Sequence, residues 1–299
     1  EHCRRTRRPT FLHLRTTRIM GHAGTDFEIE WRSIEELMQV EAGDPLLRSA
    51  HIAMASGLYT KESLLAQYEA IRGQCRDVDQ PSAALLADLK QDWAHLVDTL
   101  GVTASPRYLH HRGKPLLAIW GLGFQDRPGS AADAAAIISW FHDGAPVSQR
   151  ATLLGGVPTH WRTLSDDSKT DPAWADVYAS FDVLSPWSVG RYADDAGAVA
   201  FKTGQIVPDL AATSAKGVDY LPVVFPGFSW KNLNAGPLNQ IPRKGGSFWW
   251  RQVYNAVGAG STMLYGAMFD EVDEGTAMFK LAPSAAALPA QGSFVSLDA

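Results

Sequence analysis

The sequence predicts an α/β fold, a (β/α)8 barrel of the TIM type that is incomplete or degenerate in its first two strands. Helix-like and strand-like segments alternate from about residue 51 to residue 269, as in parallel β/α units. The strand-like runs are almost continuously apolar, which is typical of strands covered on both faces. Polar or aromatic residues follow these runs, at the strand ends where a barrel carries its functional face.

The helices are predicted from apolar residues that recur at three- and four-residue steps. In residues 82–101 this spacing links Leu89, Trp93 and Leu96. Ser130 is expected to cap the helix that follows it. Helices are expected at residues 31–41, 61–75, 82–101, 130–142, 172–180, 193–215 and 246–259.

The strands are predicted from short apolar runs bounded by glycine, proline or charged residues. They are expected at residues 51–57, 115–121, 151–157, 181–187, 220–226 and 262–269. All but the first of these are expected to be mutually parallel, with helices outside. No strand pattern is present in residues 1–50, so two barrel strands are expected to be missing there.

The length of the chain suits one large α/β barrel as well as it suits two domains. The 299 residues include 45% apolar and 20% charged residues, which argues against global disorder. Residues 1–30 are expected to be a basic, poorly ordered segment, with six arginines in the first eighteen residues. Residues 31–299 are expected to form a single barrel-type domain.

Charge and motifs exclude several classes of function. The net charge of −5 argues against nucleic acid as a partner, and no apolar run reaches the ~18 residues of a membrane span. Cys3 and Cys75 form neither a disulfide framework nor a metal-ligand pattern. No cofactor is expected. No signal peptide is visible, and the sequence sets neither the compartment nor the oligomeric state.

An acidic cluster follows the last predicted strand. The candidate carboxylates are Asp270, Glu271, Asp273 and Glu274. Glycoside hydrolysis uses two carboxyl groups, one protonated and one ionised, and Glu271 and Glu274 are close enough in sequence to share a cleft. The alternatives are a solvated acidic loop, a Ca²⁺ site or, because the segment reads DEVD, a caspase cleavage site.

Aromatic and polar residues at the other strand ends are candidates for substrate binding. Aromatic rings suit the apolar faces of sugars, and the chain has ten tryptophans. For several of these residues the alternative is core packing or anchoring of a loop. The candidates are Trp120, Trp187, Arg191, Tyr192, Phe228, Trp230, Arg243 and Asp270. Asp182 is expected to be a structural cap, while His110, His111 and His160 lack metal-ligand spacing and are expected to be surface or hydrogen-bonding residues.

Several segments, in this order over about residues 85–295, resemble a known group of proteins. They are YLHHRGKPLLAIWGLGF, GGVPTHWRTL, FDVLSPWSVGRY, YLPVVFPGFSWKNLN, IPRKGGSFWWRQ and MFDEVDEGTAMFK. The group is the bacterial glycoside hydrolase family 71/99-like proteins, which include the family 99 endo-α-mannosidases and endo-α-mannanases. The resemblance implies a carbohydrate substrate, mannan-like or from the plant cell wall.

The family signature Phe-Asn-Glu-Trp-x-Glu-Gly-Thr resembles residues 269–276, with Asp270 in place of Asn and Val272 in place of Trp. The resemblance implies that Glu271 and Glu274 are catalytic. It implies a retaining mechanism through a 1,2-anhydro sugar, in which Glu271 deprotonates the sugar 2-hydroxyl and Glu274 acts as acid and then as base. The alternative is an inactive or fragmentary relative that only binds carbohydrate.

Overall fold

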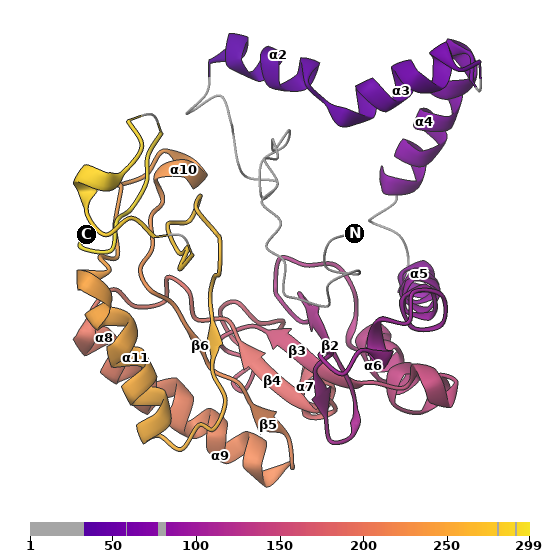
Figure 1. The fold of residues 1–299 in the computed structure, drawn as a ribbon. Coiled ribbons are helices and arrows are strands. Elements are labelled where there is room, and N and C mark those ends of the chain that lie inside the picture. The colour runs from indigo at the N-terminus through magenta and orange to yellow at the C-terminus, as the bar shows by residue number, and fades with distance from the viewer. Residues whose placement is uncertain (1–32, 58, 77–81, 280, 291) are drawn as a thin grey trace.

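The chain forms a curled five-stranded sheet with helices along its outer side, an incomplete β/α barrel (Figure 1). The computed structural model describes residues 33–57, 59–76, 82–279, 281–290 and 292–299. The strands are β1 His110–His111, β2 Lys114–Trp120, β3 Thr152–Val157, β4 Val183–Pro186, β5 Asp219–Tyr220, β6 Val223–Val224 and β7 Tyr265–Gly266. The first five form one sheet in sequence order, and β6 and β7 form a second.

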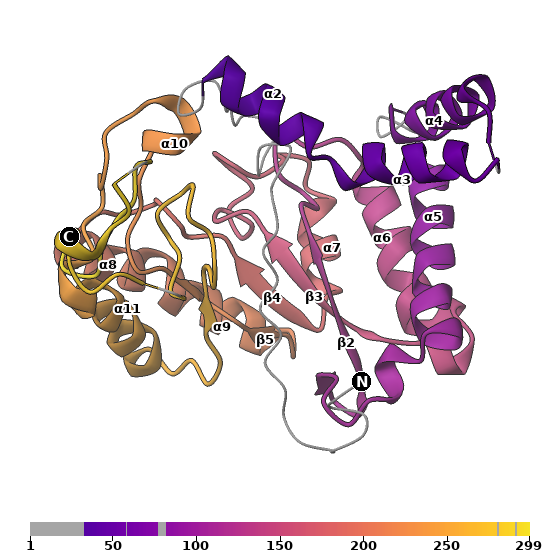
Figure 2. The same ribbon diagram turned by 45° about the horizontal axis from the view of Figure 1, so that its top comes forward.

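The strands pair as the sequence predicts. Strands β2 to β5 are parallel neighbours, with Leu116 opposite Thr152 and Leu154 opposite Val183. Strands β6 and β7 are also parallel. Strand β1, which was not predicted, forms an antiparallel hairpin with β2. Figure 2 shows β3 and β4 pointing toward the side of the molecule on which helix α10, Lys231–Asn234, lies.

The last two predicted strands are much shorter than expected. The segment 220–226 is divided between two sheets, because β5 pairs with β4 while β6 pairs with β7. Pro222 lies at the division, where its missing N–H cannot continue the ladder, and its carbonyl accepts the Tyr265 amide at 3.0 Å. In the segment 262–269 only Tyr265–Gly266 is strand.

The prediction of a strand at residues 51–57 is wrong, because residues 51–55 belong to helix α3, Pro45–Ala55, and residues 56–57 form a turn. A short apolar run does not distinguish a strand from a helix by its period. The sequence Asp44-Pro45 carried the missed signal, since proline is favoured at the first position of a helix. The described residues 33–50 are helical apart from a short turn. Residues 1–32, including the predicted basic segment, lie outside the described residues.

The helices otherwise follow the predicted order. They are α2 Ile34–Ala42, α3, α4 Lys61–Arg76, α5 Ser82–Ala94, α6 Ala131–Ser139, α7 Trp174–Ala179, α8 Asp195–Phe201, α9 Val207–Ala215, α10 and α11 Ser247–Gly258. Ser130 caps α6 as expected, and it forms a capping box with Asp133. Helices α2 to α4 lie apart from the helices that cover the sheet (Figure 1). No helix in the described part of the chain is both long and apolar enough to span a bilayer.

Two main apolar clusters support the strand ends. The first joins the sheet to α6 and α7 and includes Phe141, Leu153 and Tyr178, each with no exposed surface. The second joins β6 and β7 to α11 through Phe225 and Phe248. Burial of such apolar side chains stabilises a fold by about 1.5–3 kcal/mol each.

Asp182 is the structural residue that the sequence predicts at the start of β4. Its Oδ2 atom accepts hydrogen bonds from the His142 Nε2 atom and the Leu153 amide, both at 2.8 Å. Burial would raise the pKa of Asp182, but these hydrogen bonds outweigh burial and lower the pKa below 3.8. A lowered pKa in the folded state stabilises the protein above the unfolded-state pKa, and this stabilisation is lost as the pH falls through the folded-state pKa.

We therefore expect Asp182→Asn to lower the free energy of unfolding by about 2 kcal/mol near neutral pH. The difference between the variant and the wild type should shrink as the pH falls below about 4, because the wild-type carboxylate becomes protonated. Urea unfolding at a series of pH values measures this. A difference that stays constant down to pH 2 would show that the charge of Asp182 is not what stabilises the fold.

Candidate active site

The acidic cluster lies in a turn at the C-terminal end of β7. Glu271 is 5% exposed, and its Oε1 atom accepts the Asp273 amide at 3.1 Å. Glu274 is half-buried and Asp270 is exposed. The cluster is therefore not a uniformly solvated loop, because one of its carboxylates is nearly removed from water. Such unequal environments are what acid–base chemistry with two carboxyl groups requires.

The acidic turn is tied to the loop that follows β6. The Ser229 amide donates to the Glu274 carbonyl at 2.8 Å. Gly275 has a φ of +66°, in the region that favours glycine, and a Cβ atom at this position would lie 3.0 Å from the Ser229 Cβ atom. The backbone at Glu274 and Gly275 is therefore held against Ser229 in the loop that follows β6.

Arg243 anchors the same turn through hydrogen bonds to its backbone. It is 1% exposed, and its Nη2 atom donates to the carbonyls of Gly275 at 2.5 Å and Ala277 at 2.6 Å. Burial lowers the pKa of the Arg243 guanidinium to about 10. Of the two roles that the sequence left open for Arg243, substrate contact and loop anchoring, the contacts match loop anchoring.

Three aromatic rings from separate strands meet at the strand ends. The ring of Trp120 lies 5.4 Å from that of Trp187 and 5.8 Å from that of Tyr265, measured between centroids. Trp120 is 39% exposed. Tyr265 was missed by the sequence analysis, although its place in the strand directly before the acidic turn was a usable signal. The cluster offers a partly exposed apolar surface of the kind that binds sugar rings.

Trp120 lies directly over Gly156, its neighbour on β3. A Cβ atom at Gly156 would meet the Trp120 ring at 1.9 Å. We expect Gly156→Ala to displace the ring and to lower the free energy of unfolding by about 1–3 kcal/mol, as overpacking does. Thermal unfolding and tryptophan fluorescence measure both effects.

Gly204→Ala is the matched control, because a Cβ atom at Gly204 would meet no atom within 4 Å. It should not lower the melting temperature, because alanine is favoured over glycine in the helical segment Lys202–Ile206, and it should leave the fluorescence spectrum nearly unchanged. If Gly156→Ala and Gly204→Ala had the same melting temperature and the same fluorescence spectrum, Trp120 would not be closely packed on β3.

The remaining candidates divide between surface and core. Trp230 is 38% exposed and its ring lies 4.8 Å from that of Phe228, which is 5% exposed. Tyr192 is buried, and its hydroxyl donates to the Gln252 Oε1 atom at 2.9 Å. Burial raises the pKa of Tyr192. Phe228 and Tyr192 thus pack in the second apolar cluster, while Trp230 remains accessible to a ligand.

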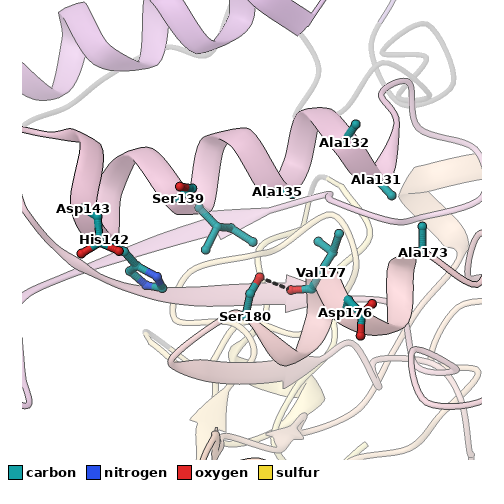
Figure 3. Close-up of a pocket in the computed structure, with 11 residues that line it drawn as sticks. Ala131, Ala132, Ala135, Ser139, His142, Asp143, Ala173, Asp176, Val177 and Ser180 are labelled. Carbon is teal, nitrogen blue, oxygen red and sulfur yellow. Dashed lines mark hydrogen bonds between the residues drawn. The ribbon is translucent and has the colours of Figure 1, made fainter.

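A separate hollow of about 480 Å³ lies between α6 and α7, away from the acidic turn (Figure 3). Its walls are largely small or apolar side chains, including Ala131, Ala135 and Val177, with His142 and Asp143 at one end. The hollow lies between two outer helices and away from the strand ends. We therefore place the candidate site at the strand ends, where the carboxylates and aromatic rings lie. Among the residues that the structure describes, no cluster of three or more His, Cys, Asp or Glu side chains is arranged to hold a metal ion.

Comparison with known proteins gives matches among solved structures. No protein-family model and no curated protein sequence matches the chain. Two solved structures of the GH99 endo-alpha-mannosidase from Bacteroides thetaiotaomicron, one in complex with bis-tris-propane, are similar to it with TM-scores of 0.51 and 0.52 and 16% sequence identity. Each match covers 71% of this chain but only 57% and 60% of those enzymes, less than two thirds of their length. At this identity the likeness shows a distant relationship in fold.

Proposed function

We propose that the protein is a retaining glycoside hydrolase that acts on a polysaccharide or oligosaccharide, mannan-like or from the plant cell wall. The observation that carries this proposal is the acidic turn after β7, in which Glu271 is buried and Glu274 is half-buried. The distant likeness in fold to an endo-alpha-mannosidase supports it. The proposal places the reaction at the strand-end face of a (β/α)8 barrel, of which the described strands form a curled part.

In the proposed mechanism the two glutamates have separate tasks. Glu271 takes the proton from the sugar 2-hydroxyl, whose oxygen attacks the anomeric carbon and forms a 1,2-anhydro sugar. Glu274 gives its proton to the leaving-group oxygen as the glycosidic bond breaks. Water then opens the anhydro ring while Glu274 takes a proton from it and Glu271 returns a proton to the 2-oxygen. Two displacements at the anomeric carbon retain its configuration.

Aromatic and polar residues supply the proposed binding surface. Trp120, Trp187 and Trp230 offer rings to the apolar faces of sugars, and Arg191 and Asp270 offer polar contacts. Phe228 and Tyr192 support this surface from the core, and Arg243 fixes the acidic turn. No cofactor or metal enters the proposed reaction.

One observation favours a second candidate function, that of an inactive relative that only binds carbohydrate. Residues 51–57 are helical except for a terminal turn, where the resemblance to family 99 places a barrel strand. In that family this strand and the strands before it would supply part of the sugar-binding site. That part of the site would then be incomplete in this chain. Binding without hydrolysis is the expected behaviour of such a protein.

A screen of the full chain against α-mannans and plant cell-wall glycans separates the two candidates. Chromatography of new reducing ends detects hydrolysis, and affinity electrophoresis in gels that contain each glycan detects binding. Hydrolysis of any one glycan supports the proposed enzyme. Retarded migration without product supports the binding protein, and absence of both contradicts a carbohydrate function.

A further inference from the structure

A half-buried carboxylate joins the loops that follow β3 and β4. The side chain of Asp167 is 13% exposed. Its Oδ1 atom accepts the His160 amide at 3.1 Å and the His160 Nδ1 atom at 2.9 Å. Its Oδ2 atom accepts the Thr159 amide at 3.0 Å and the Arg191 Nη2 atom at 2.5 Å. One aspartate thus receives four hydrogen bonds and fixes His160 and Arg191 beside each other.

This cluster belongs to the same face as the aromatic rings. Thr159 and His160 follow closely on Val157, the last residue of β3, and Arg191 lies five residues beyond the end of β4. The Thr159 hydroxyl donates to the carbonyl of Trp187. The loops that hold His160 and Arg191 therefore also hold a ring of the proposed binding surface.

The hydrogen bond to Asp167 determines which nitrogen of His160 carries the proton. Burial would raise the pKa of Asp167, but its hydrogen bonds and the charge of Arg191 outweigh burial and lower the pKa. The carboxylate is therefore ionised near neutral pH, and the His160 Nδ1 atom carries the proton that it shares with Asp167. In the neutral imidazole, Nε2 is then a hydrogen-bond acceptor.

Both partners keep capacity for a ligand. The His160 side chain is 25% exposed, and its Nε2 atom lies 3.6 Å from the Asp166 Oδ2 atom, which is within ion-pair distance of a protonated ring but too long for a hydrogen bond. The Arg191 side chain is 39% exposed and gives one of its nitrogens to Asp167. A partly exposed imidazole with an acceptor nitrogen and an exposed guanidinium with further donors are thus held by the same carboxylate.

We propose that His160 and Arg191, oriented by Asp167, form a binding subsite for two adjacent hydroxyl groups of a neutral sugar. One hydroxyl donates to the His160 Nε2 atom, and its neighbour accepts from the Arg191 guanidinium. Asp166 and Asp167 together outweigh the charge of Arg191, so the subsite disfavours anions. This inference rests on the proposed carbohydrate function and adds His160, which the sequence analysis had set aside.

The test is isothermal titration of the full chain with neutral manno-, xylo-, arabino- and galacto-oligosaccharides. We expect His160→Ala to weaken binding of the recognised oligosaccharide about tenfold, the effect of one lost hydrogen bond. His142→Ala is the matched control. Its side chain is also 25% exposed and also bonds an aspartate, but it lies at the opposite ends of the strands. It should leave affinity unchanged.

Each outcome decides a separate question. Equal affinity of the wild type and His160→Ala would overturn the subsite and leave the proposed function standing. If none of the oligosaccharides binds the wild type, the proposed function falls and the subsite falls with it. Nitrogen-15 NMR of the wild-type imidazoles needs no variant. It should show protonation at the Nδ1 atom of His160 and a shift of this ring on addition of the recognised oligosaccharide, and an unmoved His160 signal would also overturn the subsite.

Discussion

Glu274→Gln should lower kcat/KM on a natural glycan by ~10²–10⁴, the usual contribution of general acid catalysis. The amide keeps the shape of the side chain but has no acidic proton for the leaving-group oxygen. The loss should be smaller on an aryl glycoside with an activated leaving group, which departs without a proton. Initial rates on both substrates measure the effect, and thermal unfolding checks that the variant folds.

Glu271→Gln should lower the rates on both substrates alike, because Glu271 assists the attacking oxygen and not the leaving group. Asp273→Asn is the matched control, since it removes a nearby carboxylate that has no task in the proposed mechanism. Unchanged rates in both glutamine variants would end the assignment of this pair. Equal losses in all three variants would indicate a general effect of charge in the acidic turn.

Arg243→Met should lower the free energy of unfolding by about 2–5 kcal/mol. The substitution keeps much of the buried apolar stem but leaves the carbonyls of Gly275 and Ala277 without the guanidinium, and an unpaired buried polar group costs about 1–3 kcal/mol. The melting temperature should fall on the order of 10 °C. Because Arg243 fixes the backbone around Glu274, any glycosidase activity should fall as well, even below the melting temperature.

Arg251→Met serves as the control for Arg243. The side chain of Arg251 is 42% exposed and bonds Asp195 at 3.3 Å, and exposed ion pairs contribute at most about 1 kcal/mol. Denaturant unfolding of the two variants should therefore differ by at least 1 kcal/mol. Similar stabilities would mean that Arg243 is not the anchor that its contacts indicate.

The sequence predicted most of the sheet because its strands are unambiguous in composition. The runs at β2, β3 and β4 are apolar, short and bounded by turn residues, so their composition and their length both indicate strands. The segment 51–57 was misread because the six apolar and small residues that follow His51 fit either a strand or a helix. The division of 220–226 between two sheets was also unpredictable. It depends on the pairing of β5 with β4 and of β6 with β7, which are distant in sequence.

The residue types of the candidate site could be predicted from the sequence, but the burial and the contacts of these residues could not. Glu271, Glu274 and the tryptophans stand out by type and by position after a strand. The burial of Arg243 depends on two carbonyls more than thirty residues away, which no local pattern encodes. Asp167 is likewise ordinary in sequence, and only the folded chain brings two loops onto its carboxylate.

The most direct test of the central claim is a crystal structure of Glu274→Gln with a glycan that the wild-type protein recognises. We expect sugar rings stacked on Trp120, Trp187 or Trp230, with an anomeric carbon beside Glu271 and the glycosidic oxygen beside residue 274. A glycan bound elsewhere, for example in the hollow between α6 and α7, with the acidic turn facing only solvent, would contradict it.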